Sequence, residues 1–176
     1  MILNDILELL KYTIPALTVF LTAYFLLTRY MQKEATEKAI ELKLKRDKEI
    51  TMLRLQAYER LALFLERIAP ANVISRVRTP DMMCTELQYA MVRNIREEYE
   101  HNLSQQVYVS SATWNLIVAS KDEIIKTINL IGQQLPPDSS SGTLINAIFT
   151  GIARANAPLP TEAALEILKT ECRELF

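Results

Sequence analysis

The feature that most constrains this chain is an apolar run near its N-terminus that contains no charged residue. Residues 12–28 read YTIPALTVFLTAYFLLT. A helix that crosses a bilayer needs about 20 mainly apolar residues, because the hydrocarbon core is about 30 Å thick. Residues 9–30 meet that length if the Lys11 ammonium reaches the membrane surface. The run therefore predicts a transmembrane anchor within residues 1–30.

Two other structures also begin with an apolar run. A buried helix of a soluble bundle can have the same hydropathy and length. A secretory signal peptide has a shorter apolar core, followed by a small-x-small cleavage site, and no such site precedes Arg29. The hydropathy and length of the run favour an anchor over a buried helix. The helical pattern that continues past Arg29 argues against a signal peptide.

The basic residues indicate how the anchor is oriented. Upstream of the apolar run, Lys11 is the one basic side chain. Downstream lie Arg29, Lys33, Lys38, Lys43, Lys45, Arg46 and Lys48. Since basic residues within about 20 positions of a span favour the cytoplasmic side, we expect a short N-terminus outside the cytoplasmic (inner) membrane and the C-terminal domain in the cytoplasm.

A charged segment, residues 31–49, follows the anchor. No Gly or Pro occurs between Pro15 and Pro70, so one helix can run through the whole of this region. Two i,i+4 ion pairs are expected in it, Glu34–Lys38 and Glu41–Lys45. The segment has no continuous apolar seam, which predicts a solvated helical stalk that acts as a spacer.

Residues 50–176 have the pattern of a small helical domain. An apolar seam recurs at spacings of three and four in Ile50, Leu53, Ala57, Leu61, Phe64 and Ile68. This seam could pack on the chain's own C-terminal domain or against a second copy. Fewer than three heptads is short for an independent coiled coil, which favours packing within the chain.

Turn and cap residues then divide the rest of the domain. We expect a loop over 71–79, a helix that starts at Thr79-Pro80 and ends near His101 or Asn102, and an extended piece over 103–110. Further helices are expected to start at Ser110 or Ser111, at Thr143 and at Thr161. The predicted fold class is all-α: a transmembrane helix that continues into a long stalk helix, then a small cytoplasmic bundle of four helices and the stalk's end.

Composition and motifs argue against several kinds of activity. A net charge of −1 provides no strongly basic surface for nucleic acid, and three glycines are too few for the phosphate loops of a nucleotide-binding α/β domain. His101 is the one histidine, so Glu98-x-x-His101 lacks the second such unit that a di-iron bundle needs. Cys84 lies 17 residues from His101, about 26 Å along a helix, too far for a thiol–imidazole pair. We predict no catalytic, cofactor or metal residues, no enzyme activity, and reduced thiols at Cys84 and Cys172.

Two polar clusters are candidate interaction sites. The first is His101, Asn102, Gln105 and Gln106, which could form a recognition patch for a protein or simply build an ordered corner at the end of a helix. The second is Arg76 with Arg78, which could hold an anion or a lipid headgroup.

Most of the chain, including the anchor and the stalk, resembles a known family. The tract EEYEHNLSQQVYVS at 97–110, the following Trp114 and INLIG, and the segment RLQAYERLALFLERI at 54–68 are similar to an uncharacterised Bacteroidetes family of small single-pass membrane proteins. The resemblance implies one N-terminal anchor and a helical cytoplasmic domain. It implies no activity, cofactor or catalytic residue.

These features together predict a non-enzymatic membrane-anchored protein. We expect a scaffold or accessory subunit that touches lipid through its N-terminal helix and binds a protein partner or a second copy. The alternative is a membrane-tethered sensor of an anion or lipid headgroup.

Overall fold

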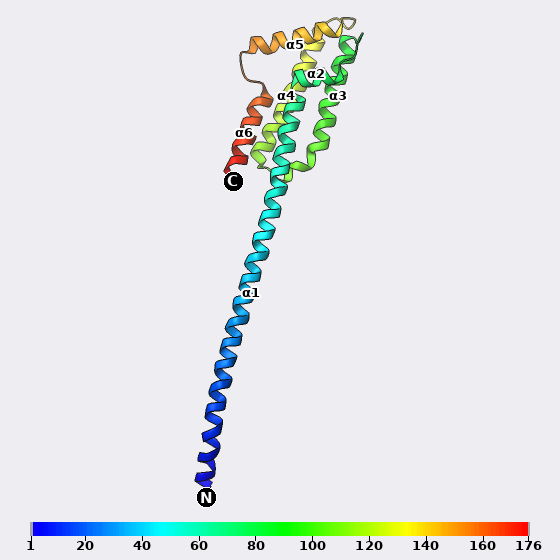
Figure 1. The fold of residues 1–176 in the computed structure, drawn as a ribbon. Helices are drawn as coiled ribbons and strands as arrows, with labels where there is room; N and C mark the ends of the chain where they lie inside the picture. The colour runs from blue at the N-terminus through cyan, green and yellow to red at the C-terminus, as the bar shows by residue number, and fades with distance from the viewer. Residues whose placement is uncertain (1, 176) are drawn as a thin grey trace. The chain divides into compact units, whose positions relative to one another are not determined.

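The chain is all-α. The computed structural model describes residues 2–175, with side chains from Lys11 onward, and these residues contain no strand. Figure 1 shows the helices α1 (Ile2–Ile68), α2 (Pro70–Val77), α3 (Cys84–Asn102), α4 (Ser111–Gln133), α5 (Ser141–Ala155) and α6 (Pro160–Glu174), with the short 3₁₀ helix η1 (Leu103–Val107) after α3. The predicted fold class is confirmed: a long N-terminal helix is followed by a helical bundle.

Contacts divide the chain into two units, one up to Ile50 and one from Thr51 onward. In the first unit every described side chain is exposed. The apolar run has its large side chains uncovered, with Tyr12 77% exposed and Phe20 66% exposed. The side chains of Leu9 and Leu10, at the start of the predicted span, lie outside the described residues. In the charged segment both expected ion pairs are present, Lys38–Glu34 and Lys45–Glu41, each at 2.7 Å.

The second unit has one apolar core. The predicted seam supplies four of its buried residues, Ala57, Leu61, Phe64 and Ile68, each at most 1% exposed. Packing within the chain is therefore confirmed for this part of the seam, while Leu53 is 48% exposed. The facing helices contribute a matching set of buried side chains: Leu87, Met91, Ile95, Ile117, Ile128, Leu144, Ile148 and Leu168.

The helices of this unit pack in a simple order. Helix α4 lies beside α6 and α3, and α5 crosses the ends of α3 and α4 (Figure 1). Between α3 and α4, Tyr99 stacks on Trp114 with ring centroids 5.8 Å apart, and the Lys121 ammonium lies 4.2 Å from the centre of the Tyr99 ring. These contacts close one side of the core.

The prediction of a loop over 71–79 was wrong, because Pro70–Val77 forms α2. Pro70 occupies the first turn, where its missing N–H costs nothing. Val73 and Ile74 are buried and pack α2 on α3. Tertiary packing therefore stabilises a helix of eight residues that would be too short to persist alone.

The predicted helix starts at Pro80 and at Thr143 were also wrong. Helix α3 begins at Cys84, since Asp81 has a left-handed backbone with φ of 62° that interrupts a helix. The segments before α3 and α5 pair with each other instead: Cys84 N donates to Ser139 O at 2.8 Å, and Ser141 N donates to Met82 O at 3.0 Å. This long-range pairing sets both helix starts.

The connection after α3 differs from the prediction as well. Residues 103–107 form η1 and not an extended piece, with Tyr108 N donating to Gln105 O at 3.0 Å. The predicted cap at Ser110 is confirmed, because its hydroxyl oxygen accepts from Thr113 N at 3.2 Å. The last helix starts at Pro160, one residue before the predicted Thr161.

Candidate functional site

The predicted corner lies where α3 passes into η1. His101 is exposed in the last turn of α3, and Asn102 Nδ2 donates to the Glu98 carbonyl at 2.8 Å, which satisfies one free carbonyl of the helix end. Gln105 is 9% exposed and its Nε2 donates to Ser104 Oγ at 3.2 Å, while Gln106 faces solvent. Asn102 and Gln105 therefore stabilise the corner through hydrogen bonds within the chain. The side chains of His101 and Gln106 are exposed and accessible to a partner.

A shallow hollow of about 400 Å³ borders this corner. It lies between η1 and the part of α1 after Thr51, and its lining includes Leu53, Gln56, Arg60, Gln105 and Val107. Two apolar side chains stay uncovered there, with Val107 78% exposed and Leu53 48% exposed. The corner therefore combines amide groups with exposed apolar surface, a composition suited to protein contacts.

The two candidate arginines are both exposed but differ in what they contact. Arg76 Nη2 donates to the Arg67 carbonyl and to Asn94 Oδ1, each at 2.8 Å. These bonds hold the end of α2 against α1 and α3. Arg78 is the C-cap residue of α2. Val77 separates the two arginines in the sequence, and the two acceptors of Arg76 belong to Arg67 and Asn94.

The Glu98 and His101 side chains have separate surroundings. The Glu98 carboxylate accepts from Arg67 Nε at 2.8 Å, which ties α3 to α1. Among the described residues, no three His, Cys, Asp or Glu side chains gather as a metal site would require. Cys84 is buried and Cys172 is half-buried, and both are free thiols.

One polar centre was not predicted from the sequence. The Glu171 carboxylate on α6 accepts from Tyr58 Oη at 2.7 Å, from Ser110 N at 2.8 Å, from Ser110 Oγ at 2.7 Å and from Thr113 Oγ1. It therefore joins α1, α6 and the N-terminus of α4, where a negative charge also meets the positive end of the helix dipole. The cap at Ser110 was visible in the sequence, but its partner lies 61 residues away.

These bonds change the protonation of the centre. Partial burial would raise the pKa of Glu171, but the hydrogen bonds from Thr113, Ser110 and Tyr58 outweigh burial and lower it from 4.5 to about 2. Burial, followed by the bond to Glu171, raises the pKa of Tyr58 from 10.0 to about 12. Both groups therefore keep one protonation state at neutral pH, with Glu171 ionised and Tyr58 protonated.

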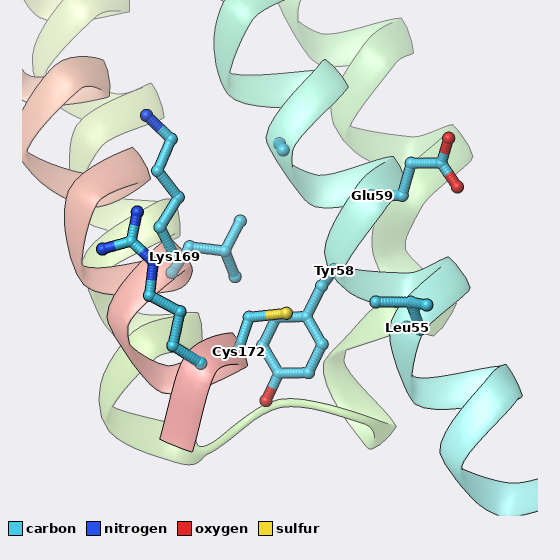
Figure 2. A pocket seen from close by; sticks show the side chains of 8 residues that line it. Leu55, Tyr58, Glu59, Lys169 and Cys172 are labelled. Carbon is cyan, nitrogen blue, oxygen red and sulfur yellow. The ribbon is translucent and has the colours of Figure 1, made fainter. Parts of the chain in front are cut away.

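A second groove, of about 450 Å³, runs between α1 and α6. Figure 2 shows its floor, where the Tyr58 ring and the Cys172 thiol lie between the two helices. Leu55 and Glu59 line the α1 side, and Lys169 and Arg173 line the α6 side. The groove was not predicted, because α6 approaches α1 only in the folded unit.

Comparison with known proteins gives a family but no activity. A protein-family model described as a family of unknown function, DUF7935, matches residues 4–175. The chain belongs to this family. The expectation of an uncharacterised family is confirmed. No curated protein and no solved structure matches the DUF7935 chain.

Proposed function

We propose that this DUF7935 chain is a non-enzymatic, single-pass protein of the cytoplasmic membrane. Residues 12–28 form the core of the anchor, residues 31–49 act as a spacer, and the helical unit binds a protein partner in the cytoplasm as a scaffold or accessory subunit. The observation that carries the proposal is the uncovered apolar helix of the first unit.

That helix is apolar on every side and stays uncovered. By length and composition, the helix over Lys11–Ile68 contains the one segment of the described residues that could cross a membrane, and none of that window is buried. Soluble proteins rarely leave apolar surface of this extent in water. The hydroxyls of Thr18, Thr22 and Thr28 bond to carbonyls four residues earlier at 2.7–2.8 Å, so they need no water as partner. A bilayer supplies the surroundings that these side chains need.

The charge distribution supports the orientation. Arg29 follows the apolar run directly and lies 4.9 Å from the centre of the Phe25 ring. Further basic residues extend to Lys48, whereas the side before the run contributes Lys11. The positive-inside bias therefore favours a cytoplasmic helical unit. The resemblance to small membrane proteins of Bacteroidetes supports the same assignment.

Partner binding is assigned to the corner at η1. Val107 is 78% exposed beside the exposed Gln106, and Gln105 borders the adjoining hollow. An apolar group with amides around it resembles the centre and rim of a protein interface. No comparable argument applies to catalysis, since the polar centre at Glu171 is used up in internal hydrogen bonds.

The test is to purify the full chain from membranes in mild detergent and identify what co-purifies in fixed stoichiometry. Gln106→Arg and Val107→Arg should remove that protein, while Gln133→Arg, an exposed glutamine on α4, should keep it. Loss of helicity in the corner variants is checked by circular dichroism. A partner that stays bound to both corner variants, or the lack of any partner, would contradict the scaffold assignment.

The alternative function is a membrane-tethered sensor that binds an anion or a lipid headgroup at Arg76 and Arg78. It has weaker support, because Arg76 Nη2 already donates to two groups of the chain. Thermal stabilisation of the chain by inorganic phosphate or by an anionic headgroup would favour this alternative.

A further inference from the structure

We infer that the face formed by α6 and the α1 residues after Thr51 pairs with a second copy of this chain. In the pair, a two-fold axis runs parallel to the two helices, and Glu59 of each copy faces Lys169 and Arg173 of the other. The inference rests on the proposed anchor only for the common orientation of the two copies. Its other grounds lie within the helical unit.

The first ground is an apolar strip that the fold leaves uncovered. Along α1, Met52, Leu55 and Leu63 are 52%, 42% and 57% exposed, although Leu61 two residues earlier is fully buried. Leu55 and the half-buried Cys172 also line the groove between α1 and α6, where Leu168 is buried. Apolar surface that is contiguous and edged by charges marks an interface more often than a solvent face.

The second ground is the division of charge across this strip. Figure 2 shows the Glu59 carboxylate on the α1 side and the Lys169 side chain on the α6 side. Arg173, one turn further along α6, also lines this side of the groove. Lys169 Nζ also pairs with Glu166 Oε1 at 2.7 Å on its own helix. Arg173 adds a second positive charge to this edge, so the α6 edge has a surplus of positive charge and the α1 edge is negative.

A two-fold axis makes this surface complementary to itself. An isologous interface places the same patch of two copies face to face, so each edge meets the opposite edge of the partner. Rotation about an axis parallel to α1 brings α1 of one copy over α6 of the other. The contact of Glu59 with Lys169 and Arg173 is then made twice. Exposed ion pairs add little affinity, so the apolar strip supplies most of it and the charges fix the register.

A common anchor gives the two copies the same membrane orientation. Two copies with the same membrane orientation can be related only by an axis along the membrane normal. Confinement to a membrane also raises the effective concentration of one copy near another.

The test uses two charge-reversed forms of the full chain, each with its own affinity tag, in mild detergent. Glu59→Lys gives both edges positive charge, and the double variant Lys169→Glu/Arg173→Glu gives both edges negative charge. We expect each form alone to have a dimer Kd raised about tenfold or more, because like charges then face each other. A mixture of the two forms should recover dimers that carry both tags, since opposite charges meet again at both contacts.

Glu100→Lys is the matched control, because Glu100 is an exposed acid on α3 away from this face. It should dimerise like the unaltered chain. Circular dichroism verifies that each variant folds. Dimers that carry both tags cannot form through a contact within one copy. Their recovery in the mixture therefore shows that the altered charges lie at an interface and not in an internal ion pair.

Cys172 supplies a second readout. It is half-buried on the groove floor, and Cys84 is buried in the core. A maleimide should label Cys172 faster in Glu59→Lys than in the unaltered chain, with Cys84 slow in both. A monomeric unaltered chain, or dimers that persist in both reversed forms, would overturn the inference. The proposed anchor fails separately, if the chain is found outside the membrane fraction.

Discussion

Glu171 shows how a single residue can hold distant parts of this chain together. Its carboxylate accepts hydrogen bonds from α1 through Tyr58 and from the start of α4 through Ser110 and Thr113. The same hydroxyl that caps α4 therefore also binds α6. A hydrogen bond to a charged group contributes more than a neutral one, and a donor left without a partner costs free energy.

Replacement of Glu171 should therefore destabilise the unit. We predict that Glu171→Ala lowers the free energy of unfolding by about 2 kcal/mol or more, because the buried Tyr58 and Thr113 hydroxyls lose their acceptor, and Ser110 loses its bonds as well. Tyr58→Phe removes one of these bonds and should cost about 1 kcal/mol. Glu166→Gln, on the exposed face of the same helix, is the control and should leave the thermal midpoint unchanged. Melting followed by circular dichroism at 222 nm (the standard helix signal) measures all three, and an unchanged midpoint in Glu171→Ala would contradict the assigned role.

The same centre predicts a pH dependence. Because the pKa of Glu171 is lowered from 4.5 to about 2, its stabilisation is fully present above pH 4.5 and is lost as the pH falls towards 2. Tyr58 acts in the opposite range: its pKa is raised from 10.0 to about 12, so its contribution is present below pH 10 and is lost as the pH rises towards 12. Thermal midpoints across both ranges should show these losses. The acid loss should be smaller in Glu171→Gln, and an identical acid profile would contradict the account.

At the scale of elements, α1 after Thr51 presents one buried face and one exposed face. Leu61 is fully buried, whereas Leu63 is 57% exposed. We predict that Leu61→Ala costs about 2–5 kcal/mol, because a fully packed side chain leaves a cavity. Leu63→Ala should cost much less and serves as the matched control. Equal losses in the two variants would mean that the helix packs on a different face.

The sequence predicted those elements whose signals are local. The seam spacing identified the buried face of α1, and Ser110 identified the start of α4. Prediction from the sequence failed where contacts with distant segments determine the local structure. Pairing of the backbone around Met82 and Cys84 with Ser139 and Ser141 displaced two helix starts, and packing on α3 made a helix of α2.

The candidate sites follow the same rule. The corner residues were placed correctly at the end of α3, since chain neighbours stay together. The hollow beside the corner and the groove between α1 and α6 are each formed by segments that come together only in the folded unit. The spacing of residues along the sequence therefore does not predict either of them. Glu171 was missed for the same reason, because its donors lie 58 to 113 residues away.

At the scale of the whole molecule, the proposed anchor limits which proteins the helical unit can contact. A unit anchored as proposed searches a surface and not a volume, which favours weak contacts such as those proposed at the corner at η1 and at the face between α1 and α6. Since each contact uses a different face, one copy could bind a partner and a second copy at the same time.

Corner variants should therefore leave the dimer intact, and the Glu59→Lys variant should still bind the corner's partner.

One measurement tests both the proposed anchor and its orientation. A reporter that is active only in the cytoplasm is fused after residue 176, and membranes are washed with alkaline carbonate to remove peripheral proteins. The account predicts an active reporter that stays in the washed membranes, and its release by Leu17→Lys/Leu21→Lys, which places two charges in the span. A reporter that is active only outside the cytoplasm, or a chain that the wash releases without any substitution, would contradict the account.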